Sequence, residues 1–412
     1  MSEKVKATGK RKVTKAKAGK KDTAEEAAPV GAADPLLKMD EEFELAAYVD
    51  GMSEDVVIDP YDGTQQIFRG HRDAIRAIAV DADRGVMYSA SWDETVLVWS
   101  LLDASQLGIL PHGCWVNALQ ILTYTPSAAA AAVAASAASA EGKLLGTIGL
   151  HAPRVATGAE DGNVTVWGTA QTPVGKEYQT LWQLRASHGP VTCMALDPDE
   201  NFLFAASLTA INAIHLATGT AARVYQTRED VNAVAAHDEH LFAACDDGVI
   251  LVFDIFGGFV LREMASHKGP VRGLLLLEDS NMLVSCGDDA TVKLWTLSTG
   301  ACQRTFTGHR KSVRCVGLRS GERERFIYSA SIDGSIRCTR LATGKGGVVR
   351  NFTANAMVLL ANAHGRYRGE LLAGDYAGRI YCFPLRESEM AVVDAGLLGN
   401  SAYNTGGATV HA

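Results

Sequence analysis

The sequence lacks the features that mark a metal site, a secreted protein or a membrane protein. Its eight cysteines are scattered, and no two of them stand as C-x-x-C. Zinc sites need clustered ligands and secreted domains carry paired cysteines, so we expect reduced thiols, no metal and no cofactor, in a protein of the cytoplasm, the nucleus or both. No run of about 18 strongly apolar residues is present, and the Lys-rich amino-terminal end has no apolar segment, so we expect neither a membrane span nor a secretory signal.

Large aromatic residues are also scarce. Six Trp and 12 Phe stand against 40 Gly in 412 residues, which indicates many turns and few large anchors in the core. The hydrophobic fraction of 47% still allows a sizeable core, in one large domain with tails or in two ordinary domains. The segment "TGKGG" (343–347) lacks the spacing of a P-loop, and no strand–GxGxxG–helix unit is recognisable, so nucleotide chemistry is not indicated.

The net charge of −8 is distributed unevenly. Residues 1–21 contain nine Lys or Arg and one Glu, whereas residues 22–62 contain one Lys and 13 acidic residues. Neither segment can bury enough apolar area to offset chain entropy, so residues 1–62 are predicted to be a disordered tail, basic and then acidic. The rest of the chain is nearly balanced in charge, so contact with nucleic acid is expected only through the Lys-rich tail. That tail also has the composition of a nuclear-import signal or of a simple solubilising segment.

From residue 63 onward the sequence has the texture of β-strands. Short apolar or alternating runs recur between Gly, Asp, Asn and Ser residues. A recurring phrase places Asp six residues before an aromatic residue, and copies of it, some degenerate, end at residues 99, 167, 215, 253, 295, 339 and 383. Most copies lie about 40–45 residues apart, the period of propeller blades with four short strands each. The longest gap holds an Ala-rich stretch near 125–143, which we interpret as an inserted loop.

These motifs resemble the tryptophan–aspartate (WD) repeat family of β-propellers. Its other elements are present too: a His stands four residues before the apolar start of an inner strand, and a Ser or Thr stands four residues before the turn Asp. The resemblance implies an all-β fold, a single seven-bladed propeller of four-stranded antiparallel blades over residues 63–386, followed by a C-terminal extension at 387–412. Residues 64–68 are expected to pair beside 378–385, completing the seventh blade and closing the ring.

The repeated His, Ser and Asp residues invite a catalytic interpretation, which their repetition opposes. A catalytic triad needs one Ser, one His and one Asp at an open site, whereas this chain contains several similar sets. The alternative is a buried chain in which Asp orients His, His bonds Ser or Thr, and the hydroxyl reaches the Trp N–H. We therefore predict no enzymatic activity, no catalytic residue, and a structural brace made by His71, Ser89, Asp93, Trp99, His112, Thr157, Asp161, Trp167, His267, Ser285, Asp289, Trp295, His309, Ser329 and Asp333.

Binding of partners is the more promising function. The resemblance implies that residues beside the start of each inner strand, and before each turn Asp, point to one face of the ring. Arginines suit acidic or phosphorylated peptides through bidentate hydrogen bonds, and Trp is enriched in interface hot spots. The alternative is that Arg272 and Arg314 pair with acidic residues of their own rim. The predicted partner-binding residues are Arg76, Trp92, Trp115, Asn117, Asn232, Arg272, Arg314 and Tyr376.

These observations favour a non-enzymatic scaffold within a multiprotein complex. Protein partners or peptides would be held on the propeller faces, and no membrane would be involved. A first alternative is a nuclear or nucleolar component of RNA processing or ribosome assembly that uses the Lys-rich tail. A second is the substrate-receptor subunit of a ubiquitin ligase, although the sequence contains no adaptor-binding W-D-x-R motif. Because one fold serves many functions, the fold alone does not decide among them.

Overall fold

The computed structural model describes residues 66–122 and 154–384, with gaps at 83, 173–174, 198, 200, 278–279, 321–324 and 361–369. The tail expected at 1–62, the Ala-rich loop expected near 125–143 and the extension expected at 387–412 lie outside the described residues. The described residues contain 28 β-strands and no α-helix. None of them forms a helix long and apolar enough to cross a membrane.

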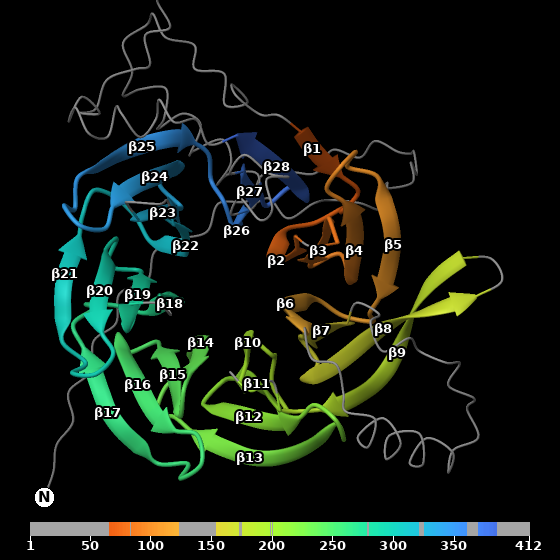
Figure 1. The fold of residues 1–412 in the computed structure, drawn as a ribbon, viewed down its shortest axis with the longest axis horizontal. Coiled ribbons are helices and arrows are strands. Elements are labelled where there is room, and N and C mark those ends of the chain that lie inside the picture. Colours follow the sequence, from red (N-terminus) through yellow and green to blue (C-terminus); the bar gives the residue numbers. More distant parts are fainter. Residues whose placement is uncertain are drawn as a thin grey trace, which may run out of the picture. The chain divides into compact units, whose positions relative to one another are not determined.

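The strands form seven four-stranded antiparallel sheets, arranged as a ring around a central axis (Figure 1). This confirms the all-β, seven-bladed propeller expected from the sequence. The first three blades, in chain order, consist of β2 (Ile75–Asp81), β3 (Val86–Ser91), β4 (Thr95–Ser100) and β5 (Gln106–Pro111); β6 (Val116–Leu122), β7 (Arg154–Ala159), β8 (Asn163–Thr172) and β9 (Gly175–Arg185); and β10 (Cys193–Leu196), β11 (Phe202–Ser207), β12 (Ala210–His215) and β13 (Thr220–Gln226).

The remaining four blades repeat the same inner-to-outer order of strands. They consist of β14 (Val231–His237), β15 (His240–Cys245), β16 (Val249–Asp254) and β17 (Val260–Ala265); β18 (Val271–Leu277), β19 (Met282–Gly287), β20 (Val292–Thr296) and β21 (Cys302–Phe306); β22 (Val313–Ser320), β23 (Arg325–Ser331), β24 (Ser335–Arg340) and β25 (Gly346–Asn351); and β26 (Ala356–Leu360), β27 (Glu370–Gly374), β28 (Arg379–Pro384) and β1 (Gln66–Arg69).

The ring is closed by the first strand of the chain. β1 pairs antiparallel with β28, with Phe68 opposite Ile380, so the outermost strand of blade 7 comes from the start of the fold. The Phe68 ring is buried and meets Trp99 of blade 1 edge to face, with ring centroids 5.7 Å apart. The expected pairing of residues 64–68 with 378–385 is therefore confirmed over the described strand, and it gives blade 7 its fourth, outermost strand.

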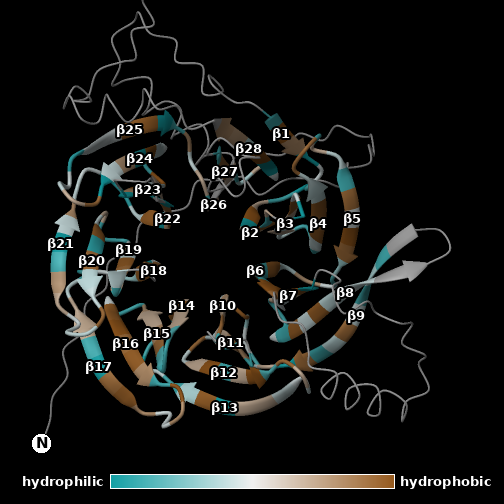
Figure 2. Cartoon of the chain, viewed as in Figure 1, coloured by the Kyte–Doolittle hydropathy of each residue, from teal (hydrophilic) through white to brown (hydrophobic). Residues whose placement is uncertain are grey.

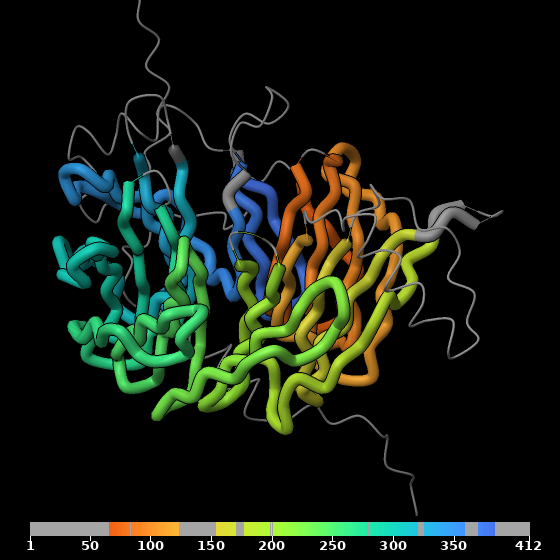
Figure 3. Tube along the Cα trace, turned by 60° about the horizontal axis from the view of Figure 1, so that its bottom comes forward, coloured from red at the N-terminus to blue at the C-terminus, as the bar shows by residue number. Residues whose placement is uncertain are grey.

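The core lies between neighbouring blades. Side chains alternate along each strand, so every sheet presents apolar residues to the blade on either side, a pattern visible as alternating bands in Figure 2. Tyr88 and Val98 of blade 1, for example, pack in one buried cluster with Val155 and Trp167 of blade 2. Each blade thus depends on both neighbours for the burial of its apolar surface, and the strands cross the ring from one face to the other (Figure 3).

An irregularity at the start of the inner strand recurs in five blades. The register with the second strand shifts around one residue, which lies between two paired positions as a β-bulge. Such a bulge re-aims the side chain of the unpaired residue. The residues in this position, called here the bulge residues, are Arg76, Asn117, Asn232, Arg272 and Arg314. The face of the ring at which the inner strands begin is called the top face below.

Candidate functional site

The predicted brace is fully hydrogen-bonded in blade 1. His71 Nδ1 donates to Asp93 Oδ2 at 2.8 Å, Ser89 Oγ lies 2.7 Å from His71 Nε2, and Trp99 Nε1 donates to the same Oγ at 2.8 Å. A neutral imidazole fits every one of these contacts, because Nε2 then accepts from the Ser89 hydroxyl. Burial raises the pKa of Asp93, but hydrogen bonds from His71 and Thr95 outweigh burial and hold that pKa at about 2.

Blade 5 contains the same arrangement. His267 Nδ1 lies 2.9 Å from Asp289 Oδ2, His267 Nε2 lies 2.7 Å from Ser285 Oγ, and Trp295 Nε1 donates to Ser285 Oγ at 2.8 Å. Burial lowers the pKa of His267, and the facing Asp289 only partly opposes this, so the neutral ring is favoured. Both ring nitrogens are engaged and the imidazole side chain is fully buried, as it is in blade 1. An enzyme base must reach its substrate, and neither histidine is placed to do so.

In blade 2 the hydrogen-bond chain is broken, contrary to the predicted pattern. Trp167 Nε1 donates to Thr157 Oγ1 at 2.9 Å, but Thr157 Oγ1 donates to the main-chain oxygen of Thr165 at 3.1 Å. With its single proton used there, the Thr157 hydroxyl has none for His112. His112 Nε2 is buried and has no hydrogen-bond partner among the described residues, and burial lowers the pKa of His112 to about 4.

Asp161, the expected partner of His112, is also directed elsewhere. Its carboxylate accepts hydrogen bonds from the main-chain and side-chain nitrogens of Asn163 in the same turn. The His112 ring instead meets the Trp167 ring edge to face at 5.3 Å. The four predicted members of this blade are therefore close together in the fold, but only Thr157 and Trp167 are joined to each other by a hydrogen bond.

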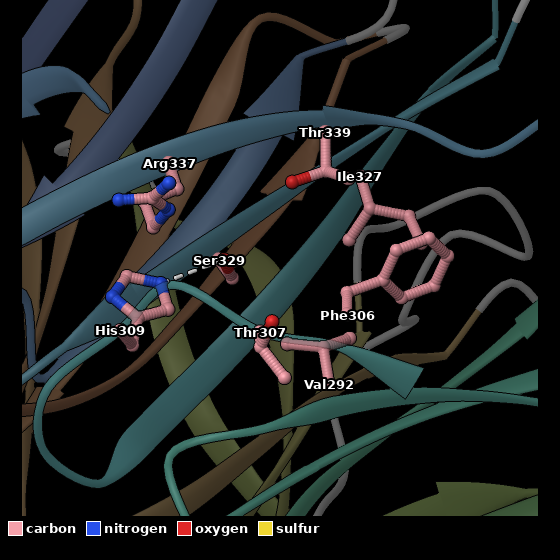
Figure 4. A pocket seen from close by; sticks show the side chains of 8 residues that line it. All are labelled: Val292, Phe306, Thr307, His309, Ile327, Ser329, Arg337 and Thr339. Carbon is pink, nitrogen blue, oxygen red and sulfur yellow. Dashed lines mark hydrogen bonds between the residues drawn. The ribbon is translucent and has the colours of Figure 1, made fainter. Parts of the chain in front are cut away.

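Blade 6 retains the polar half of the brace and replaces the aromatic half. His309 Nδ1 lies 3.0 Å from Asp333 Oδ2, and His309 Nε2 lies 2.8 Å from Ser329 Oγ. Thr339 stands where the other braces have Trp, and beside it is a small cavity of about 10 Å³. The Arg337 side chain extends along this cavity toward His309 (Figure 4).

A second set of residues surrounds the top face, where the bulge residues follow a simple rule. The residue before the turn Asp of each blade is called here the turn residue, and every bulge residue except Arg314 meets the turn residue of its own blade, of the preceding blade or of both. Asn117 accepts from Trp92 Nε1 of the preceding blade at 3.3 Å and donates to Glu160 Oε2 of its own blade at 2.8 Å. Asn232 Nδ2 donates to Asp246 Oδ1 of its own blade at 2.7 Å.

Arg272 is saturated by these contacts. Its guanidinium pairs with Asp288 Oδ2 at 2.6 Å and 3.0 Å, approaches Asp246 Oδ1 at 3.4 Å and donates to Asn232 Oδ1 at 2.9 Å. The hydrogen bond to Asp288 is the main reason that the pKa of Arg272 is raised. For this residue, therefore, the interpretation as an ion pair within the rim describes the observed geometry.

Arg314, although equivalent in sequence, has no such partner. The turn residue of its own blade is Ile332, and the Asp288 carboxylate of the preceding blade is already held by Arg272 and by the Ser312 hydroxyl. Arg314 Nε is buried without a hydrogen bond, and no ion pair to Arg314 is found among the described residues. Its positive charge is nevertheless close enough to contribute to the lowered pKa of Asp288, which burial alone would raise.

Arg76 lies against aromatic residues instead of carboxylates. Its guanidinium carbon is 5.1 Å from the centre of the Trp92 ring, and Arg76 Nε is likewise buried without a hydrogen bond among the described residues. Burial is the largest cause of its lowered pKa; Tyr376 opposes the shift and Arg314 adds to it. Trp92 in turn stacks on Trp115, with ring centroids 5.1 Å apart and 29° between the planes.

The contacts among Arg76, Trp92 and Trp115, together with the electrostatic influence of Arg314 and Tyr376 on Arg76, group five of the eight predicted partner-binding residues into one surface. Trp115 and Tyr376 are each 45% exposed. We call this surface the aromatic–arginine patch, and it consists of Arg76, Trp92, Trp115, Arg314 and Tyr376. The other three predicted residues, Asn117, Asn232 and Arg272, are occupied by hydrogen bonds within the rim.

Two rim residues outside the predicted partner-binding set complete the ring. Thr192 and Asn355 follow the buried residues Val191 and Ala354, just as the bulge residues follow buried residues in other blades. Thr192 Oγ1 donates to the main-chain oxygen of Val231 at 2.7 Å, and Asn355 Nδ2 donates to that of Ile75 at 2.6 Å. The sequence signal that identifies them is their position directly after the buried residue at the start of an inner strand.

The described side chains do not assemble a metal site. No group of three or more His, Cys, Asp or Glu side chains is arranged for a metal ion within the described part of the chain. All eight cysteines are free, and burial raises the pKa of Cys193, Cys245 and Cys315 to about 12, which makes these thiols poor nucleophiles at neutral pH. The aromatic–arginine patch presents aromatic surface and positive charge.

Known proteins resemble this chain in its repeats. Protein SLOW WALKER 1 of Arabidopsis thaliana is 38% identical over 99 residues, which cover 23% of this chain and 19% of that protein. The U3 small nucleolar RNA-associated protein 15 homolog of Xenopus laevis is 29% identical over 175 residues, covering 41% and 33%. Protein TOPLESS of Arabidopsis thaliana is 32% identical over 94 residues, covering 22% and 8%. The matches thus span a third or less of these relatives' own lengths.

The family of the repeats is identified directly. The sequence pattern of the family described as "WD domain, G-beta repeat" matches residues 63–100, 178–209, 258–296 and 300–339. Each of these segments begins in the outermost strand of one blade and continues into the inner strands of the next, so the four matches join blades 7 and 1, 2 and 3, 4 and 5, and 5 and 6. With four recognised repeats and seven four-stranded blades closed by β1, the chain belongs to the WD-repeat family of β-propellers.

Proposed function

We propose that this protein is a non-enzymatic scaffold that holds protein partners on the top face of its propeller, as part of a multiprotein complex. Membership of the WD-repeat family indicates an interaction role in general terms. The finer proposal is supported by one observation above all: the aromatic–arginine patch exposes Trp115 and Tyr376 beside two arginines that lack carboxylate partners among the described residues.

The physical properties of the patch suit a protein partner. Aromatic and Arg side chains dominate the energetics of protein interfaces, because they bury much area at low cost in conformational entropy. Trp92 is fixed by the Trp115 stack and by its hydrogen bond to Asn117, so little ordering is left to be done on binding. The patch also spans parts of blades 1, 2, 6 and 7, which makes it a property of the closed ring.

Affinity capture followed by mass spectrometry tests this proposal. Full-length protein and the variants Trp115→Ala and Phe256→Ala would be used as baits at equal levels. Phe256 is a matched control, because it is 65% exposed but lies in the turn between β16 and β17, outside the patch. We expect Trp115→Ala to lose its main partners at least tenfold while Phe256→Ala retains them. Equal capture by wild type and Trp115→Ala would overturn the proposal.

A second candidate is a role in nucleolar RNA processing, which would place the protein in the nucleus. It is favoured by the similarity to a relative named as a U3 small nucleolar RNA-associated protein, together with the nine Lys or Arg of residues 1–21. Positive tails bind nucleic acid with an affinity that falls steeply with salt. We expect a salt-dependent RNA affinity that disappears when residues 1–21 are deleted. RNA binding of equal strength without residues 1–21 would contradict this candidate.

A further inference from the structure

We propose that Arg76 and Arg314 form a clamp for one anionic side chain of a bound peptide, whereas Arg272 takes no part in it. This inference rests on the proposed function, since it assigns the ligand of the same patch. It assigns different roles to three arginines that occupy the same position in their blades.

The positions of the two arginines bring them to the same edge of the ring. Arg76 and Arg314 are the bulge residues of blades 1 and 6, and only blade 7 lies between those blades (Figure 1). Blade 7 has Asn355 at the corresponding position, a short side chain whose amide donates to the Ile75 main-chain oxygen. The residue between the arginines therefore carries no charge and is already bonded to the backbone.

Neither guanidinium group forms an ion pair among the described residues, although Glu160 acts on Arg76, and Arg314 on Asp288, through longer-range electrostatics. Each has a buried Nε with no hydrogen-bond partner among the described residues. The nearby acidic groups are engaged elsewhere: Asp288 by Arg272 and Ser312, and Glu160 by Asn117. Like charges near each other repel, so an anion bound between the two guanidinium groups relieves this repulsion.

The surroundings also pre-organise the clamp. Arg76 packs over Trp92 at 5.1 Å, a cation–π contact that restricts the orientation of the guanidinium. A guanidinium held in this way presents a fixed fork of donors, the geometry that carboxylate and phosphate oxygens accept bidentately. Trp115 and Tyr376 offer apolar area for the residues on either side of the anionic one.

Arg272 illustrates what a satisfied arginine looks like at this position. It has two carboxylates and one amide oxygen within 3.4 Å, so an incoming anion would have to displace existing contacts and approach two negative charges. Arg272 is accordingly assigned to holding blades 4 and 5 together, and it serves as the internal control for the clamp.

Peptide libraries provide the test. Fluorescein-labelled peptides of randomised sequence, with a central residue fixed as Glu, phosphoserine or Gln, would be titrated with the full chain and followed by fluorescence anisotropy. We expect tighter binding, by tenfold or more, of the Glu library or the phosphoserine library than of the Gln library. The stronger of the two anionic arms distinguishes a carboxylate from a phosphate as the natural ligand group.

The variants Arg76→Gln, Arg314→Gln and Arg272→Gln then assign the preference. We expect Arg76→Gln or Arg314→Gln to reduce the preference for the anionic library over the Gln library to threefold or less. The double variant should reduce this preference little further, because both arginines bind the same anionic group. Arg272→Gln, or Arg272→Lys if the former does not fold, should retain the preference. A preference that survives in the Arg76→Gln/Arg314→Gln double variant, or that is lost only with Arg272, would overturn the clamp.

The partner-capture experiment separates this inference from the proposed function. Loss of partners with Trp115→Ala, combined with an unchanged peptide preference in the double variant, would overturn the clamp and leave the scaffold role standing. If Trp115→Ala captures as well as wild type and no library binds with an anionic preference, both the clamp and the top-face scaffold role are wrong.

Discussion

Arg337 lies over Gly308 in blade 6, at the place where the indole of Trp99 lies over Gly70 in blade 1. A side-chain carbon added to Gly308 would come within 2.7 Å of an Arg337 guanidinium nitrogen, and one added to Gly70 would come within 2.7 Å of the Trp99 ring. Blade 6 has thus replaced a missing indole with the side chain two residues earlier in the same strand. The replacement is partial, since a cavity of about 10 Å³ persists between Arg337 and Thr339.

Restoring Trp at position 339 should therefore destabilise the protein on its own. The cavity is far too small for an indole and Arg337 occupies the remaining space, so we expect Thr339→Trp to cost about 1–3 kcal/mol through overpacking. Adding Arg337→Leu, the residue that blade 1 has at this position as Leu97, should recover that loss and raise the melting temperature above that of the single variant. Thermal unfolding of the wild type, Thr339→Trp, Arg337→Leu and the double variant measures the energetic coupling between positions 337 and 339. Stabilisation by Thr339→Trp alone would contradict the assignment of this space to Arg337.

Ser89 and Thr157 should differ in what their hydroxyls contribute. Ser89→Ala removes the hydroxyl that bonds both His71 Nε2 and Trp99 Nε1. His71 Nε2 then keeps only the Ser89 main-chain oxygen at 3.1 Å, whereas Trp99 Nε1 is left buried without a partner, at a cost of about 1–3 kcal/mol. Thr157→Val removes the acceptor of Trp167 Nε1 and the side-chain donor to the Thr165 main-chain oxygen, but it takes no hydrogen bond from His112. We expect Ser89→Ala to lower the free energy of unfolding by more than Thr157→Val, measured by urea denaturation. Equal losses would indicate that His112 does depend on Thr157.

The sequence sufficed for the fold because its signals are local and repeated. The spacing of Asp93 and Trp99, copied around the ring, is a property of one blade and does not depend on any other. The closure of the ring by β1 could also be predicted, because a strand that precedes the first blade pairs with the blade that has only three strands of its own. The hydrogen bonds of blades 1 and 5 join the residues that this spacing selected.

The hydrogen-bond and ion-pair partners that the sequence did not predict depend on neighbouring blades or on side-chain rotamers. Arg272 and Arg314 occupy equivalent positions, but one faces Asp246 and Asp288 and the other faces Ile332, which only the packing of adjacent blades decides. In blade 2 the Thr157 hydroxyl donates to the Thr165 main-chain oxygen because of its side-chain rotamer, which the spacing of residues in the sequence does not determine. Residue type and spacing thus identify the candidates, whereas their partners emerge from tertiary structure.

Hydrogen exchange should rank the blades by the completeness of their hydrogen bonding. Blades 1 and 5 have the full brace, blade 2 has half of it, and blade 3 has an inner strand of only four residues and a buried Ser207 hydroxyl without a partner among the described residues. Local opening is easiest where buried contacts are fewest, so we expect β10 and β11 to exchange faster than β18 and β19. Mass spectrometry of peptic fragments measures this order. Slower exchange in blade 3 than in blade 5 would show that the brace does not set local stability.

His112 should make the protein less stable as the pH falls from about 6.5 to about 4. Burial lowers the pKa of this ring to about 4 in the folded state, whereas an unfolded chain binds the proton near its ordinary value of 6.5. Between these values the unfolded state carries more protons than the folded state, so stability rises with pH and the loss on acidification amounts to about 2–3 kcal/mol. His112→Phe should flatten the dependence of melting temperature on pH in this window, whereas His188→Gln, a change to an exposed histidine, should leave it unaltered. A pH dependence that persists in His112→Phe would assign the acid sensitivity to other groups. Below pH 4, protonation of Asp93, whose pKa in the folded state is about 2, should cause a separate loss of stability in both variants.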